Sequence, residues 1–194
     1  MSKADPAAHK KERRKTIRWV VTIFIVTIFV SGSISALSDV IMANSSTLVA
    51  FLILFAIILI GIVFDIIGMA VAAADEKPFH AMAARKVPGA KEAIALLRNA
   101  ERVSSICNDV VGDICGVVSG SASALIASQI IANFAFTWPR IISLCMSALA
   151  AGLTVGGKAV GKSFAVNSSV DIVHSVGRTI YMLHNLVKMR KKKK

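Results

Sequence analysis

The chain has 194 residues, of which 55% are hydrophobic and 18% charged, and its 23 Lys and Arg against 11 Asp and Glu give a net charge of +12. Soluble domains carry about 25% charged and about 45–50% apolar residues, so an ordinary soluble domain is excluded. The apolar content also excludes a disordered chain, and the long unbroken apolar runs exclude a β-barrel, whose strands alternate. The composition predicts an all-α membrane protein.

Four apolar runs are long enough to cross a bilayer as helices. They cover residues 19–37, 47–74, 103–135 and 141–164. We expect residues 19–165 to form one transmembrane domain, which follows a basic N-terminus over residues 1–18. A signal peptide is the alternative interpretation of the first run, but the run is longer than the usual apolar region and shows no clear cleavage pattern.

The polar segments also carry helical signals. Segment 75–102 is interrupted by prolines, and we expect two short amphipathic helices on the cytoplasmic surface, joined at Pro88-Gly89. Residues 166–194 regain apolar periodicity and end in lysines, which predicts an amphipathic helix with a basic tail that attracts anionic lipid. Because no folded soluble module accompanies these lysines, we do not expect a nucleic-acid partner.

Basic residues are distributed unevenly between the polar segments. The N-terminus holds seven Lys and Arg, segment 75–102 holds six, and the chain after residue 177 holds seven. The two remaining loops hold none and one. Since cytoplasmic loops are enriched in Lys and Arg, we expect a multi-pass protein of the cell membrane with both termini in the cytoplasm.

Four oxygen-bearing residues in the apolar runs are candidate metal ligands. Asp65 lies inside the second run, where an ionised carboxylate costs at least about 2.5–3.5 kcal/mol and therefore needs a partner or a water-filled cavity. Asn108, Asp109 and Asp113 open the third run, and the two aspartates share a helix face at spacing i, i+4. Carboxylate and amide oxygens suit Mg²⁺. In the alternative interpretation, Asp65 is not a ligand and the neighbouring backbone satisfies its side chain. Asp109 and Asp113 then lie at the start of a helix only because the helix dipole favours negative charge there.

The fourth run becomes rich in glycine around two lysines. Gly156, Gly157 and Gly161 lie beside Lys158 and Lys162. Glycines can open a membrane helix around an ion site, so we expect a helix break at Gly156-Gly157 that holds Lys158 inside the bundle near Asp65 or the Asp109/Asp113 face. In the alternative, the span ends near Val155 and Lys158 is cytoplasmic.

A stripe of small residues marks the third run. Gly112, Gly116 and Gly120 repeat at every fourth position, a spacing that lets helix backbones approach closely. The stripe predicts helix packing, either within one chain or between two copies.

Four segments in order resemble the transmembrane domain of the CorB/CorC and CNNM (cyclin M) magnesium and cobalt transporters. They are Phe64–Ala70, Gly89–Leu97, Ser105–Val111 and Gly157–Ala165, the last similar to the family's Gly-Glu-x-x-Pro-Lys motif. The resemblance implies a dimeric transporter of a divalent cation. Lys158 stands where the family has its acidic ion ligand, Gly161 stands at the family's proline, and no CBS-pair module follows the spans.

These features predict a CorB/CorC/CNNM-like transporter of Mg²⁺ or Co²⁺, with Mg²⁺ as transported ion rather than cofactor. A non-transporting membrane scaffold, in which Lys158 replaces the bound cation, is the main alternative, and a holin-like protein is a third. We do not expect an enzyme, because the sequence has no catalytic triad pattern, phosphate loop or HExxH motif.

Overall fold

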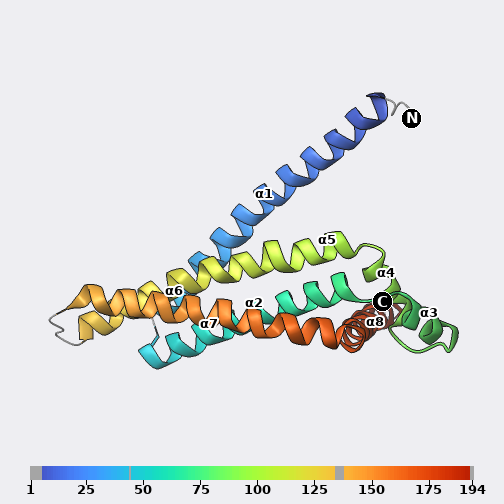
Figure 1. The fold of residues 1–194 in the computed structure, drawn as a ribbon. Helices are drawn as coiled ribbons and strands as arrows, with labels where there is room; N and C mark the ends of the chain where they lie inside the picture. Colours follow the sequence, from blue (N-terminus) through green and yellow to red (C-terminus); the bar gives the residue numbers. More distant parts are fainter. Residues whose placement is uncertain (1–5, 44, 134–137, 193–194) are drawn as a thin grey trace.

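The computed structural model describes residues 6–43, 45–133 and 138–192, and these residues are helical without any strand (Figure 1). The helices are α1 (Pro6–Ala43), α2 (Thr47–Ala73), α3 (Lys77–Ala84), α4 (Ala90–Leu97), α5 (Ala100–Ser105), the π-helical turn η1 (Ile106–Gly112), α6 (Asp113–Asn133), α7 (Pro139–Asn167) and α8 (Ser169–Lys192). Four stretches are long and apolar enough to span a membrane, namely Ile17–Met42, Thr47–Ala73, Ala100–Asn133 and Pro139–Asn167. The predicted all-α membrane fold with four spanning helices is confirmed.

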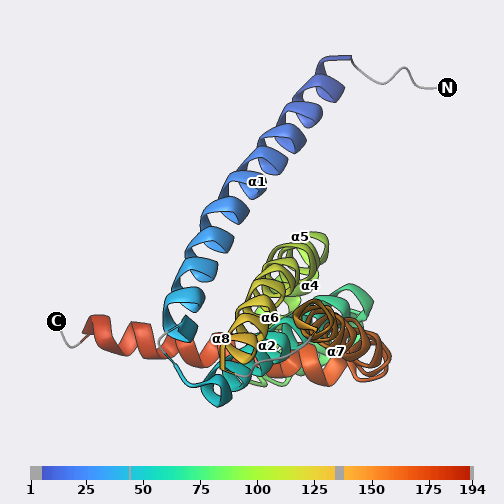
Figure 2. The same cartoon turned by 90° about the vertical axis from the view of Figure 1, so that its left-hand side faces the viewer.

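Helix α2 lies at the centre of the bundle, between α6 and α7 (Figures 1 and 2). Its buried residues recur every three or four positions, as Ala50, Leu54, Ile58, Gly61, Asp65 and Gly68. This spacing places them on one face of the helix, where Leu54 and Ile58 pack with Ala122 and Ile126 of α6. The same periodicity carries Asp65 into the interior of the bundle.

Helix α1 joins the bundle only through its C-terminal half. Its N-terminal half stands away from the other helices in Figures 1 and 2, and the side chains of Ile17, Trp19, Val20, Val21 and Phe24 are exposed. The helix extends to Ala43, beyond the expected end at residue 37. Two contacts explain the extension: the Ser38 hydroxyl faces Met42 Sδ at 3.5 Å, and Gln129 of α6 donates to the Met42 carbonyl at 2.9 Å.

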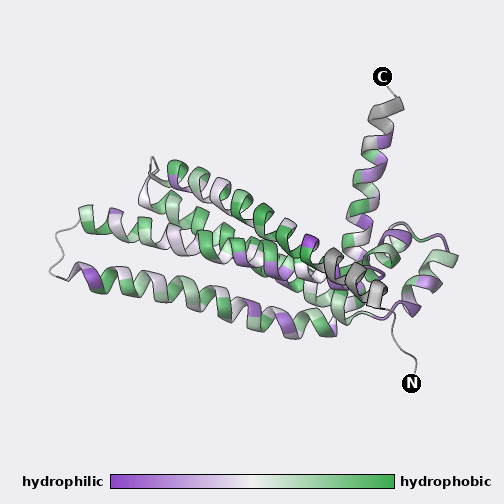
Figure 3. Ribbon diagram, turned by 90° about the horizontal axis from the view of Figure 1, so that it is seen from above, coloured by the Kyte–Doolittle hydropathy of each residue, from purple (hydrophilic) through white to green (hydrophobic). Residues whose placement is uncertain are grey.

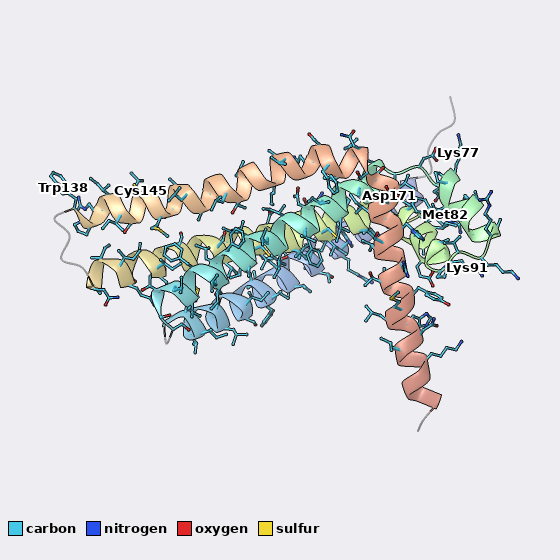
Figure 4. All side chains as sticks on the ribbon, turned by 90° about the horizontal axis from the view of Figure 1, so that it is seen from below. Lys77, Met82, Lys91, Trp138, Cys145 and Asp171 are labelled. Carbon is cyan, nitrogen blue, oxygen red and sulfur yellow. The ribbon has the colours of Figure 1, made fainter. Side chains whose placement is uncertain are left out.

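The expected pair of short helices is present as α3 and α4, with Pro88-Gly89 in the turn between them. Helix α8 packs against α4 and runs across the bundle axis (Figures 2 and 4). Phe79 of α3, Ala93 and Leu97 of α4 and Val173 of α8 form a small core with Val71 of α2. Figure 3 shows more hydrophilic residues here than along the spans. We call this end of the bundle the α8 end.

The other predicted boundaries lie within a few residues of the helix ends. The second run, 47–74, corresponds to Thr47–Ala73, and the fourth, 141–164, lies within Pro139–Asn167. The third, 103–135, begins within Ala100–Asn133, and its last two residues lie outside the described residues. The same holds for residues 1–5 of the basic N-terminus and 193–194 of the basic tail.

Candidate functional site: a buried carboxylate and ammonium

An ion pair links the second and fourth spanning helices inside the bundle. Lys158 Nζ lies 3.6 Å from Asp65 Oδ1, and the two side chains are 21% and 8% exposed. The expectation that Lys158 is held inside the bundle next to a carboxylate is confirmed, with Asp65 as its partner. At low exposure each charge compensates the desolvation of the other, which explains how an apolar bundle tolerates both.

Gly112 provides the space for this pair. A Cβ placed on Gly112 would lie 3.1 Å from Lys158 Nζ and 3.9 Å from Asp65 Oδ1. Gly112 is buried and closes the π-helical turn η1, so this turn forms the wall opposite the pair. π-Helical turns inside α-helices are rare and frequently mark functional sites.

Two acceptor oxygens next to the pair have no hydrogen-bond partner. They are Asp65 Oδ2 and Asn108 Oδ1, and both atoms are buried. Asn108 Nδ2 donates to Ser104 Oγ at 3.3 Å, which orients the amide along its own helix. Asn108 lies against Gly68 of α2, one turn from Asp65. Because buried acceptors normally have a partner, these two oxygens are candidates for contact with a water or a cation.

The other two predicted ligands lie apart from the pair. Asp109 and Asp113 are exposed, and Asp109 accepts a hydrogen bond from Ser105 on its own helix at 2.7 Å. No group of three or more His, Cys, Asp or Glu that could hold a metal occurs within the described residues. The expectation that Asp65, Asn108, Asp109 and Asp113 form one ligand set is therefore wrong for Asp109 and Asp113, and of the three only Asn108 lies close to Asp65. The wider helical turn η1, which contains Asp109, alters the simple i, i+4 register between the aspartates.

The predicted helix break at Gly156-Gly157 is wrong. Helix α7 continues without interruption from Pro139 to Asn167. Gly157 contacts the Ile62 side chain of α2, and a Cβ on Gly161 would lie 2.8 Å from Ile66 Cγ1. These glycines therefore let α7 approach α2 closely instead of opening the helix. Gly156 faces open space, and Lys162 is exposed.

The three glycines of the small-residue stripe on the third span have different surroundings in the structure. Gly112 faces the ion pair, whereas a Cβ placed on Gly116 or Gly120 would meet no atom within 4 Å. The packing stripe of α6 consists instead of Ile114, Val118, Ser119, Ala122, Ser123, Ile126 and Ala127. The expected close packing at Gly116 and Gly120 is absent among the described residues, because no neighbouring helix comes within 4 Å of a Cβ at either position.

We predict that Gly68→Ala destabilises the protein, whereas Gly156→Ala does not. An added methyl group at residue 68 meets the Asn108 amide and lies 3.0 Å from Cys107 Cβ, and overpacking of this kind costs about 1–3 kcal/mol. At residue 156 the methyl group meets open space and raises helix propensity by up to about 1 kcal/mol. Thermal unfolding of both variants in detergent checks this. Equal melting temperatures would contradict the close approach of α2 to η1.

Comparison with protein-family models, with curated proteins and with solved structures finds no match to this chain.

Proposed function

We propose that this chain is a multi-pass membrane transporter for a divalent cation, Mg²⁺ or Co²⁺, which binds at Asp65 in place of the Lys158 ammonium. The supporting observation is the buried Asp65–Lys158 pair with two unpartnered acceptor oxygens beside it. The order of motifs that resembles the CorB/CorC and CNNM transporters points in the same direction.

Asp65 and Asn108 have the chemistry that Mg²⁺ requires. This ion binds through one or two carboxylates and retains several waters, so it does not need a cage of protein ligands. The Asp65 carboxylate would supply the charge, the Asn108 carbonyl a neutral oxygen, and water the remaining ligands. Cation and ammonium compete for one carboxylate, so binding requires Lys158 to move away along its flexible stem.

We further propose that the protein lies in the cell membrane with both termini in the cytoplasm, as a homodimer, and that its basic tail binds anionic lipid. The uneven distribution of Lys and Arg supports the orientation. The open space around Gly116 and Gly120 leaves a surface of small residues on the third span that is accessible to a second copy.

A non-transporting membrane scaffold is the second candidate. It is favoured by the absence of a second carboxylate at the pair among the described residues, and by an ammonium that already neutralises Asp65. In this case Lys158 is a permanent structural substitute for the cation.

Flux measurements distinguish the two candidates. We predict that wild-type protein in proteoliposomes carries Mg²⁺ or Co²⁺ down a gradient, and that Asp65→Asn abolishes this flux because the anionic ligand is lost. Lys162→Gln is the matched control, since Lys162 is an exposed lysine one turn further along α7. Absence of flux under every gradient would exclude the transporter and leave the scaffold.

Restoring an acidic ligand provides a second test. We predict that Lys158→Glu places two carboxylates at the site and strengthens Mg²⁺ binding at least about tenfold over wild type, because a second anionic ligand replaces a repelling ammonium. Titration calorimetry of the purified protein in neutral detergent measures the effect, with Lys162→Glu as control. Equal gains in both variants would show that the site is not at residue 158.

A further inference from the structure

A second polar site lies at the α8 end, where the turn between α3 and α4 meets α8. It is a cavity of about 410 Å³, and its wall includes Lys86 and Lys91, the backbone of Gly89, Glu92, and Tyr181 of α8. Figure 4 shows Lys91 at this end of the molecule, beyond the four long helices. The cavity belongs to different elements from the Asp65–Lys158 pair.

Lys86 has an unusual backbone conformation at this cavity. Helix α3 ends in a Schellman motif, in which the Lys86 amide donates to the Ala83 carbonyl and the Val87 amide to the Met82 carbonyl, both at 3.0 Å. The motif requires a left-handed residue at position 86, usually glycine, and Lys86 adopts it with φ 57°. A lysine here costs backbone free energy that glycine does not, and it places a cationic side chain at the cavity wall.

We propose that this cavity binds a phosphate group, from an anionic lipid headgroup or from free phosphate. Lys86 and Lys91 supply two ammonium groups, and the Tyr181 hydroxyl on the facing helix supplies a neutral donor. Helix α8 crosses the bundle axis beside the ends of the spanning helices, which is the level at which lipid headgroups meet a membrane protein (Figure 2). The proposal is independent of transport at Asp65.

Glu92 also lines the cavity, and its negative charge allows a second test of the proposal. Two lysines and one glutamate give the wall a formal charge of +1, so the carboxylate opposes an anionic ligand. Removal of either lysine should therefore weaken phosphate binding, whereas Glu92→Gln should strengthen it about threefold, the size of an exposed charge pair interaction. Non-specific attraction of phosphate to a basic protein would not depend on which of these residues is changed. Weaker binding without a lysine and stronger binding in Glu92→Gln would therefore indicate a local site.

The test uses the full chain purified in neutral detergent and measures binding by titration calorimetry. The probes are short-chain phosphatidylglycerol, inorganic phosphate, and a diacylglycerol with the same acyl chains but no phosphate. We expect Lys86→Gln/Lys91→Gln to weaken binding of a phosphate probe at least about tenfold. Lys77→Gln/Arg98→Gln removes the same charge from two exposed cations of the same segment that do not line the cavity, and it should have little effect. Lysine-dependent binding of phosphatidylglycerol identifies the lipid source, and binding of inorganic phosphate alone identifies the soluble source.

Lys86→Gly is a second test variant, which removes the lysine without destabilising the fold. Weaker phosphate binding in this variant cannot be attributed to misfolding. Glycine fits the left-handed position better than lysine, so we expect a raised melting temperature together with weaker phosphate binding. Three results would overturn the proposal: loss of binding in Lys77→Gln/Arg98→Gln and not in Lys86→Gln/Lys91→Gln, equal binding of diacylglycerol, or no binding of either phosphate probe.

Discussion

Neutralising Lys158 alone, as Lys158→Met, should lower the free energy of unfolding by about 3–5 kcal/mol, the usual cost of leaving one member of a buried ion pair without its partner. The Asp65 side chain is only 8% exposed, so its carboxylate cannot recover the lost interaction from solvent. Asp65→Asn should cost less, because the Lys158 ammonium is 21% exposed on a flexible stem and can move towards water. Reversible unfolding in mixed micelles measures both values.

The double variant Asp65→Asn/Lys158→Met decides whether the two groups interact. It removes both charges, so we expect it to be more stable than Lys158→Met alone. Lys162→Met, which neutralises an exposed lysine on the same helix, is the control and should change stability by less than about 0.5 kcal/mol. If the effects of the two single variants add to within about 0.5 kcal/mol, Asp65 and Lys158 do not form a pair.

Hydrophobic patterning predicts most of this fold because a bilayer allows few backbone structures for a spanning segment. A spanning segment must satisfy its own backbone, so long apolar runs are helices, and their ends follow from polar residues. Pro88-Gly89 similarly places the turn between α3 and α4. The end of α1 was harder to locate, since Ser38 and Asp39 indicate a loop while contacts with Met42 and Gln129 keep the helix intact.

The site was predictable only in part. A lysine inside an apolar run needs an anion, so the sequence predicts a carboxylate beside Lys158. It leaves open whether Asp65 or the Asp109/Asp113 face supplies that carboxylate, and the structure identifies Asp65. The π-helical turn η1 has no comparable signal, and it determines where Asn108 and Gly112 lie. Gly157 was misinterpreted because glycine serves both helix breaks and close helix packing, and only the position of Ile62 on α2 distinguishes the two.

The second large effect is expected where α4 meets α8, at the crossing of Gly89 and Gly177. A Cβ on Gly177 would lie 2.5 Å from the Gly89 carbonyl oxygen and 3.0 Å from the Ala93 amide nitrogen. Backbone atoms cannot rotate away as a side chain does, so Gly177→Ala should cost about 2–3 kcal/mol through overpacking. Gly89→Ala should cost more, because Gly89 has φ 87°, and a side chain there adds about 1–2 kcal/mol of left-handed strain.

Limited trypsin digestion provides a local measurement of this crossing. A Cβ on Gly89 would lie 2.5 Å from the Arg178 amide nitrogen and 2.6 Å from the Arg178 Cα. The Arg178 backbone therefore packs against α4, and we expect trypsin to cleave the bond that follows it slowly in the wild type. Both glycine variants should release α8 and accelerate cleavage there. Gly152→Ala, on an exposed part of α7 with open space around it, is the control and should leave cleavage unchanged. Because the phosphate cavity is closed by Tyr181 of α8, released α8 should also lose phosphate binding, whereas unchanged cleavage in Gly177→Ala would contradict the close crossing itself.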